Sequence, residues 1–367
     1  SVVSFPFLPL SGIINAYEKF IQQKACEMFQ KLFAVALVII ALLFKADVRI
    51  VVLSNAISGI VTIIIKLMII KKNIGVKIGV HTFDRTISHQ IFAFSIWVTV
   101  ISLSARCIFN LAPTILGIVS NSGEIALFAP ANQLESYYYL FATAINGLFL
   151  ATVSRYVAQK EEEKILPLAI KVGRYQLIVM GSIFIAFLAA GKQFMNSWMG
   201  HDFEGAYYCA ILMFVPDLQK FSQQIFDTTI LAKNRVKEQA FGYVGMGAIC
   251  VIVSVILCPK LGAFGSAIGI TVSYCFLFVY MNILYKNKMG INIVYFFRKT
   301  YAAFAIPFAI GVVVALILPK VFLISGWTAV LVYGGVAAVV YIGACIPVLS
   351  AEERMVVKQA LKKIINR

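Results

Sequence analysis

Long apolar stretches separated by short polar gaps run through the whole chain. About 20 apolar residues in an α-helix cross the hydrocarbon core of a bilayer, so such stretches are typical of membrane-spanning helices. One partial stretch covers residues 5–16, and ten complete ones cover residues 31–44, 50–70, 89–117, 124–153, 175–190, 206–231, 241–258, 263–285, 302–318 and 327–349. The pattern predicts an all-α polytopic membrane protein.

The composition agrees with this fold class. Hydrophobic residues make up 61% of the 367 positions and charged residues 13%, whereas soluble domains carry about 25% charged residues. The mean hydropathy is +0.89. The seven cysteines lie mostly within apolar stretches and have no metal-ligand spacing, so we expect no metal and no cofactor.

The positive charges alternate from gap to gap. Of the 32 Lys and Arg residues, 25 lie in every second gap or in the C-terminal tail, and five lie in the intervening gaps. Lys and Arg in short loops stay on the cytoplasmic side of the membrane. This bias accounts for the net charge of +16 without a nucleic-acid partner, and it predicts a cytoplasmic C-terminus.

The tail after the last apolar stretch has a pattern of its own. Ser350 and Glu353 have the spacing of a capping box, which begins a helix. Apolar residues then alternate with lysines at Val356, Val357, Leu361 and Ile365. We expect a short amphipathic helix that lies on the anionic inner leaflet, with a solvated helix as the alternative.

Two of the basic gaps resemble each other, which suggests an internal repeat. Residues 17–24 and 226–233 align at an offset of 209 and lie on the same predicted side of the membrane. The offset predicts about three helices before residue 1, and fourteen helices in two six-helix repeats plus two terminal ones. The expected parts are residues 1–72 as the end of a first bundle, 73–88 as a cytoplasmic linker, 89–286 as a second bundle, 300–349 as two extra helices and 350–367 as the tail.

Three neighbouring stretches carry polar residues at intervals of three or four, which is one face of a helix. A charged side chain at mid-bilayer costs about 2.5–3.5 kcal/mol, so such residues face a bundle interior or a watery cavity. The three stripes are Ser95, Thr99, Ser102, Arg106 and Asn110; Asn132, Glu135, Tyr139, Thr143 and Asn146; and Asp217, Lys220, Gln224 and Asp227. They predict a central water-accessible pathway.

The chemistry of the stripes suggests two kinds of role. Arg106 and Lys220 are candidate contacts for an anion, since a guanidinium fork and an ammonium both bind phosphate. The candidate substrate contacts beside them are Asn110, Asn132, Tyr139 and Gln224, and the candidate ion-coupling acids are Glu135, Asp217 and Asp227. The alternative for Asp217 and Lys220 is a purely structural neutralising pair.

Three passages resemble the polysaccharide repeat-unit (O-antigen, Wzx-like) flippases of the multidrug/oligosaccharidyl-lipid/polysaccharide exporter superfamily. They are GIINAYEKF at residues 12–20, residues 117–158 ending in ATVSRYVA, and LGAFGSAIG at residues 261–269 together with residues 286–293. The resemblance implies a MATE-like bundle of two pseudo-symmetric halves in the bacterial inner (plasma) membrane. It further implies alternating access that moves undecaprenyl-pyrophosphate-linked oligosaccharide to the periplasmic leaflet.

The resemblance also implies partners and leaves alternatives open. The expected partners are a lipid-linked oligosaccharide, membrane lipids and other polysaccharide-assembly membrane proteins. A cation-coupled multidrug exporter of the same fold is one alternative. A membrane-embedded polymerase or acyltransferase is another, although the gap at residues 191–205 is short for a catalytic domain and His81, His89 and His201 are scattered. We therefore expect a transporter with no catalytic residues.

Overall fold

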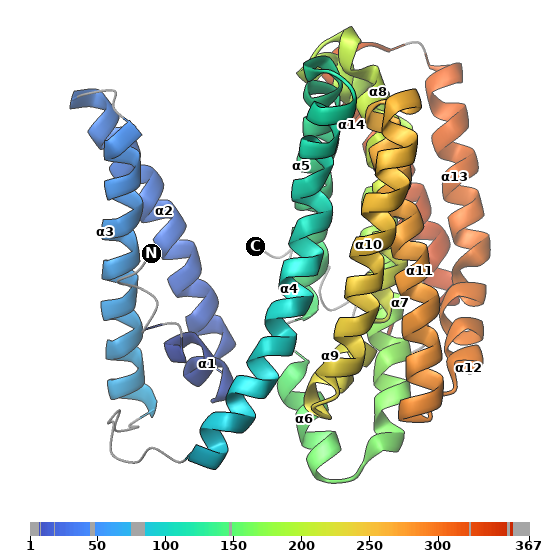
Figure 1. The fold of residues 1–367 in the computed structure, drawn as a ribbon. Coiled ribbons are helices and arrows are strands. Elements are labelled where there is room, and N and C mark those ends of the chain that lie inside the picture. Colours follow the sequence, from blue (N-terminus) through green and yellow to red (C-terminus); the bar gives the residue numbers. More distant parts are fainter. Residues whose placement is uncertain are drawn as a thin grey trace. The chain divides into compact units, whose positions relative to one another are not determined.

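The computed structural model describes residues 7, 9–17, 19–44, 48–74, 85–146, 149–322, 324–350 and 353–354, which form helices joined by short turns (Figure 1). No strand occurs among these residues, so the predicted all-α fold is confirmed. The contacts within the chain divide it into two compact units, residues 1–88 and residues 89–367.

The first unit is built on a helical hairpin. It contains α1 (Pro9–Ala16), α2 (Phe20–Phe44) and α3 (Val48–Ile69), which continues into a π-helical segment, Ile70–Ile74. The Ser58 hydroxyl on α3 donates to the carbonyl oxygen of Gln30 on α2 at 3.0 Å, and Lys66 Nζ donates to Ser11 Oγ at 2.9 Å. Polar contacts as well as apolar packing therefore hold these helices together.

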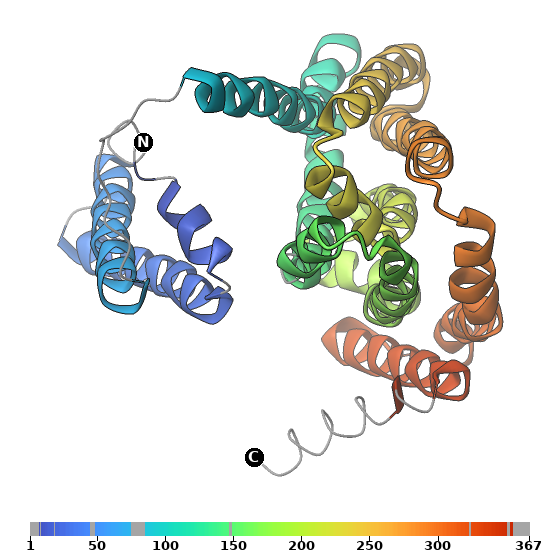
Figure 2. The ribbon, with the colours of Figure 1, turned by 90° about the horizontal axis from the view of Figure 1, so that it is seen from below.

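The second unit is a larger bundle. Its helices are α4 (Arg85–Val119), α5 (Ser122–Asn146), α6 (Leu150–Ala158), α7 (Ile165–Trp198), α8 (Glu204–Ser222), α9 (Gln224–Ala232), α10 (Val236–Leu261), α11 (Ala263–Met289), α12 (Ile293–Phe297), α13 (Ala303–Val321) and α14 (Gly326–Cys345). A π-helical segment, Arg298–Ala302, joins α12 to α13. Viewed along the bundle in Figure 2, α13 and α14 lie at one edge of this unit.

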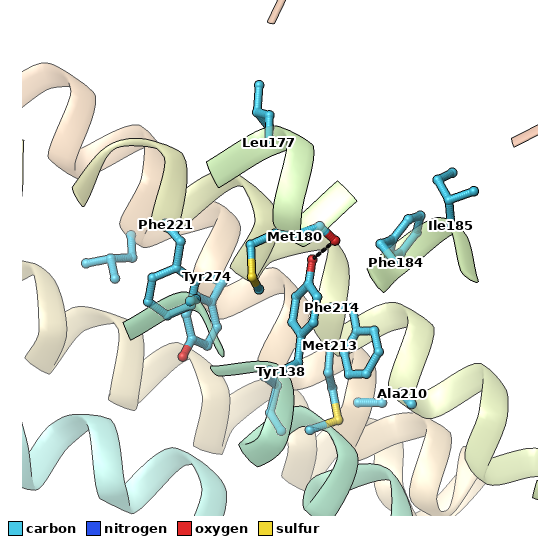
Figure 3. Packing of buried hydrophobic residues seen from close by; sticks show 14 of the residues in the cluster. Tyr138, Leu177, Met180, Phe184, Ile185, Ala210, Met213, Phe214, Phe221 and Tyr274 are labelled. Atoms are coloured by element: carbon cyan, nitrogen blue, oxygen red, sulfur yellow. Dashed lines mark hydrogen bonds between the residues drawn. The ribbon is translucent and has the colours of Figure 1, made fainter. Parts of the chain in front are cut away.

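Helix α7 is the packing centre of the second unit, in contact with α5, α8, α9, α13 and α14. Tyrosine hydroxyls from two neighbours donate to its main-chain carbonyls: Tyr138 on α5 to Met180 at 3.0 Å, drawn in Figure 3, and Tyr341 on α14 to Leu177 at 2.9 Å. Gly181 allows α14 this close, because a Cβ there would overlap the Tyr341 ring and hydroxyl.

Seven helical stretches among the described residues are long and apolar enough to cross a membrane. They are Leu53–Lys72, Ser88–Ala105, Glu162–Trp198, Val236–Leu261, Ala263–Met289, Ile293–Val321 and Gly326–Val348. This makes the chain a multi-pass membrane protein. These seven stretches are fewer than the ten that the sequence predicts. Helices α5 and α8, which carry two of the polar stripes, are not among the seven because their polar residues lower the mean hydropathy.

Two predicted continuous spans are divided in the structure. The segment expected at residues 206–231 forms α8 and α9 with a break at Gln223, and the one expected at residues 124–153 forms α5 and α6. At the first break, Gln223 Nε2 donates to Asn282 Oδ1 on α11 at 2.8 Å. A side-chain bond to a neighbouring helix therefore holds the turn that separates α8 from α9.

The predicted capping box at the start of the tail is present. The backbone N–H of Ser350 donates to Glu353 Oε2 at 2.7 Å, and the N–H of Glu353 donates to Ser350 Oγ at 3.3 Å. Residues 355–367, which hold the expected amphipathic face, lie outside the described residues.

The close contact between α7 and α14 can be tested at Gly181. We expect Gly181→Ala to lower the unfolding free energy by about 1–3 kcal/mol, since the new methyl group must displace Tyr341 and its hydrogen bond. Gly247→Ala on α10 is the matched control, because a Cβ there meets nothing within 4 Å. Alanine is the better helix former, so the control should be neutral or stabilising in a thermal-unfolding assay in detergent. Equal stability of both variants would contradict this account of the packing.

Candidate functional site

Lys220, in the last turn of α8, lies among aromatic rings of four helices. We call these rings the Lys220 aromatic cluster. Measured from Lys220 Nζ to the ring centroids, the distances are 5.8 Å to Tyr139, 5.6 Å to Phe221, 5.6 Å to Tyr243 and 5.2 Å to Tyr274. A ring face attracts a cation within about 6 Å, and by more where water is excluded. The cluster therefore stabilises a positive charge inside the bundle.

Two acids lie beside this lysine. Glu135 on α5 and Asp217 on α8 are 3% and 1% exposed, and their carboxyl groups interact with each other and electrostatically with Lys220. Both oxygens of Asp217 and Oε1 of Glu135 have no other hydrogen-bond partner among the described residues. Buried carboxyl groups without donors are costly, which makes this pair a candidate for function rather than for stability.

Asp217 and Lys220, for which a neutralising pair was the alternative interpretation, do not form a direct ion pair among the described residues. Their charges interact, but neither oxygen of Asp217 hydrogen-bonds to Lys220 Nζ. The aromatic cluster, rather than a bound carboxylate, is what surrounds the ammonium group. The lysine therefore keeps the capacity to contact an anion.

Asp227, at the start of α9, is held differently. Its Oδ1 accepts hydrogen bonds from Tyr285 on α11 at 2.8 Å and from Gln239 Nε2 on α10 at 3.1 Å. Two donors from two helices fix this carboxylate in place. Asp227 is thus a positioned group, whereas Glu135 and Asp217 lack such donors.

Lys220 and Asp227 face two cavities, both of which Tyr243 also lines. The first, of about 30 Å³, is lined by Pro216, Lys220, Gln223, Asp227, Tyr243, Tyr274, Leu277, Phe278, Met281 and Tyr285. The second, of about 310 Å³, is lined by Val98, Ile101, Tyr139, Leu150, Lys220, Phe221, Gln224, Asp227, Thr228, Leu231, Gln239 and Tyr243. A space bordered by α4, α5, α6, α8, α9, α10 and α11 therefore exists in the second unit, with a few polar groups in a mostly apolar wall.

The structure brings most of the predicted site residues together. Tyr139, Lys220, Gln224 and Asp227 line the second cavity, and Glu135 and Asp217 lie next to Lys220. Asn110 is exposed on α4, and neither cavity is lined by Asn110 or Asn132. The backbone of Arg106 belongs to α4, but its side chain lies outside the described residues, so its role stays a prediction.

The sequence stripes missed several groups of the site. Tyr243, Tyr274 and Tyr285 come from α10 and α11, which carry none of the three predicted polar stripes. The stripe did not include Gln223, because Gln223 is adjacent to Gln224 in the sequence and successive residues of a continuous helix point to different sides. The available signal was the tyrosine in each apolar stretch, since a buried hydroxyl needs a hydrogen-bond partner.

One comparison with known proteins finds a similarity, over the first part of the chain. Residues 8–149 match the family model described as "Polysaccharide biosynthesis protein". The match covers α1 to α5 and includes Glu135 and Tyr139. A comparison with curated proteins finds no match. The similarity predicted from the motifs is therefore found over residues 8–149. It supports a role in polysaccharide biosynthesis for this multi-pass membrane protein.

Proposed function

We propose that the chain is a flippase that moves undecaprenyl-pyrophosphate-linked oligosaccharide, an O-antigen or capsule repeat unit, across the bacterial inner membrane by alternating access. The observation that carries the proposal is Lys220, a cation held inside the bundle by aromatic rings and exposed to two cavities. The family match over residues 8–149 supports the substrate class.

The chemistry of the cavity fits such a substrate. A pyrophosphate needs a positive contact in a place where water is scarce, and Lys220 supplies one. The rings of Tyr139 and Tyr243 border the same cavity as Gln224. Aromatic faces and amide groups are suited to the apolar faces and hydroxyls of sugars, so one cavity offers contacts for both parts of the substrate. Arg106 is the proposed second phosphate contact.

Glu135 and Asp217 are the proposed coupling groups. Two adjacent carboxylates repel each other when both are ionised, and a proton or another cation bound between them removes the repulsion. Lys220 interacts with both acids. Loading or unloading the acid pair with a cation therefore changes the charge that Lys220 presents to the pyrophosphate, which couples the two binding events. In this scheme an ion gradient drives the cycle, with Asp227 as a third candidate acid.

A cation-coupled multidrug exporter is the second candidate function. The specific observation in its favour is that three acids, Glu135, Asp217 and Asp227, lie close to aromatic rings, a combination that also suits an organic cation. The two functions differ in whether Lys220 or the acids make the main contact with the transported molecule.

Lys220→Met separates these candidates because it removes the charge and keeps an apolar side chain in the aromatic cluster. In a bacterium that lacks its own flippase and carries this gene, we expect the variant to lower surface polysaccharide more than about tenfold, the effect of one lost charge contact on binding. Lys220→Arg should retain part of the export. The measurement is polysaccharide display on the cell surface at matched protein level.

Lys192→Met is the matched control. Lys192 also lies over a tyrosine ring, 5.6 Å from the centroid of Tyr208, but it pairs with Glu204 and lines neither cavity. Full export by Lys220→Met would refute the proposed phosphate contact. Drug resistance without polysaccharide export would instead favour the multidrug exporter.

The coupling role is tested by the double variant Glu135→Gln and Asp217→Asn in proteoliposomes. In the wild type, an imposed pH gradient should accelerate translocation of the lipid-linked sugar. In the double variant, the rates with and without the gradient should be equal, because neutral amides cannot exchange a proton. Glu124→Gln on the same helix is the control, since its side-chain oxygen still accepts from the backbone N–H of Ala263. An undiminished response of the double variant to the gradient would exclude these acids from coupling.

A further inference from the structure

A second group of cations lies away from the aromatic cluster, around the π-helical segment Arg298–Ala302. Arg174, Arg298 and Lys299 line a cavity of about 470 Å³ whose other lining residues are Tyr295, Ala303 and Val348. No acid lines this cavity among the described residues. We call it the basic cavity.

Arg174 is the fixed member of the group. Its guanidinium pairs with Glu353 at 2.7 Å and donates to the carbonyl oxygen of Val348 at 2.8 Å. Its Nε is buried and has no hydrogen-bond partner within the described residues. One N–H donor at the wall of the basic cavity therefore remains unused.

Arg298 and Lys299 are the accessible members. Both side chains are exposed, and neither forms an ion pair with any acid in the described part of the chain. The next residues hold the segment in place: Thr300 is fully buried, and the hydroxyl of Tyr301 donates to the carbonyl oxygen of Gln219 on α8 at 3.0 Å. Two unpaired cations thus project from an anchored π-helical segment, a kind of irregularity that is frequent at functional sites.

Apolar surface adjoins these charges. Val294 on α12 and Ile306 on α13 are 75% and 73% exposed, on the two sides of the π-helical segment. The apolar stretch Ile293–Val321, which is long enough to cross the membrane, begins five residues before Arg298. Cations near the end of a span, next to exposed aliphatic side chains, match the headgroup and the acyl chains of one phospholipid.

We propose that the basic cavity binds the phosphate headgroup of an anionic phospholipid, with Arg298 and Lys299 as the direct contacts and Arg174 behind them. The predicted topology places this end of the span on the cytoplasmic side, where anionic lipids bind basic pockets between helices. A headgroup bound there contacts α7, the π-helical segment and the residues after α14, and so connects these three parts. The site is independent of the proposed cargo cavity and of its lysine.

The test uses the full chain in detergent with phosphatidylglycerol as the probe and phosphatidylcholine as the neutral lipid. We expect phosphatidylglycerol to be retained in native mass spectra and to raise the thermal-unfolding midpoint, and phosphatidylcholine to do neither. The double variant Arg298→Gln and Lys299→Gln should bind phosphatidylglycerol about 25-fold more weakly, about fivefold for each charge. Lipid retention is read independently of stability, so a destabilised variant still gives an answer.

The double variant Lys286→Gln and Lys288→Gln is the matched control. It removes two exposed lysines from the last turn of α11 that do not line the basic cavity. Retention of phosphatidylglycerol by this control but not by the Arg298 and Lys299 variant supports the proposal. Equal losses in both variants would mean diffuse charge attraction and overturn it. Equal stabilisation by inorganic phosphate alone would assign the cavity to free phosphate and also overturn the lipid proposal.

Discussion

The arrangement of the second unit depends on keeping one ammonium group inside a membrane. Insertion of a lysine at mid-bilayer costs about 2.5–3.5 kcal/mol. Each aromatic face near the Lys220 ammonium returns about 0.5–2 kcal/mol, and four rings surround it. Rings from α5, α8, α10 and α11 must therefore meet at one point, and this requirement fixes how those helices are rotated about their axes.

The same unit uses tyrosine in a second way. At α7, Tyr138 and Tyr341 donate to main-chain carbonyls of an intact helix, whereas at Lys220 the tyrosines offer their ring faces. In a lipid environment, where apolar contacts alone provide little preference between helices, such polar contacts determine which helices are neighbours. Tyr138 and Tyr139 are adjacent on α5 and serve the two purposes on different sides of the helix. The packing centre and the cavity are thus connected through one short stretch of sequence.

Hydrophobic length and the spacing of polar residues were enough to predict an all-helical membrane protein and the stripe residues that lie around Lys220. Glu135, Asp217 and Lys220 were predictable because each is a charge in an apolar stretch, and a charge there needs an interior position. The aromatic cluster was not predictable, since its rings come from separate helices and tyrosine is common in membrane proteins. Asn110 shows the limit of the stripe argument: helical spacing defines a face but does not say what that face contacts. The break at Gln223 was not predictable for a related reason: Asn282, its hydrogen-bond partner, is 59 positions further along the chain.

That break has an electrostatic consequence. Dividing one span into α8 and α9 creates a helix C-terminus and a helix N-terminus within the bundle, with a partial negative and a partial positive charge. Lys220 lies in the last turn of α8, and Asp227 lies in the first turn of α9. Each charged group therefore stands at the helix end whose dipole stabilises it. A continuous helix of the same composition would have no helix end beside Lys220 or Asp227. The hydrogen bond between Gln223 and Asn282 holds the break and so helps to stabilise both charges, although it contacts neither charged group.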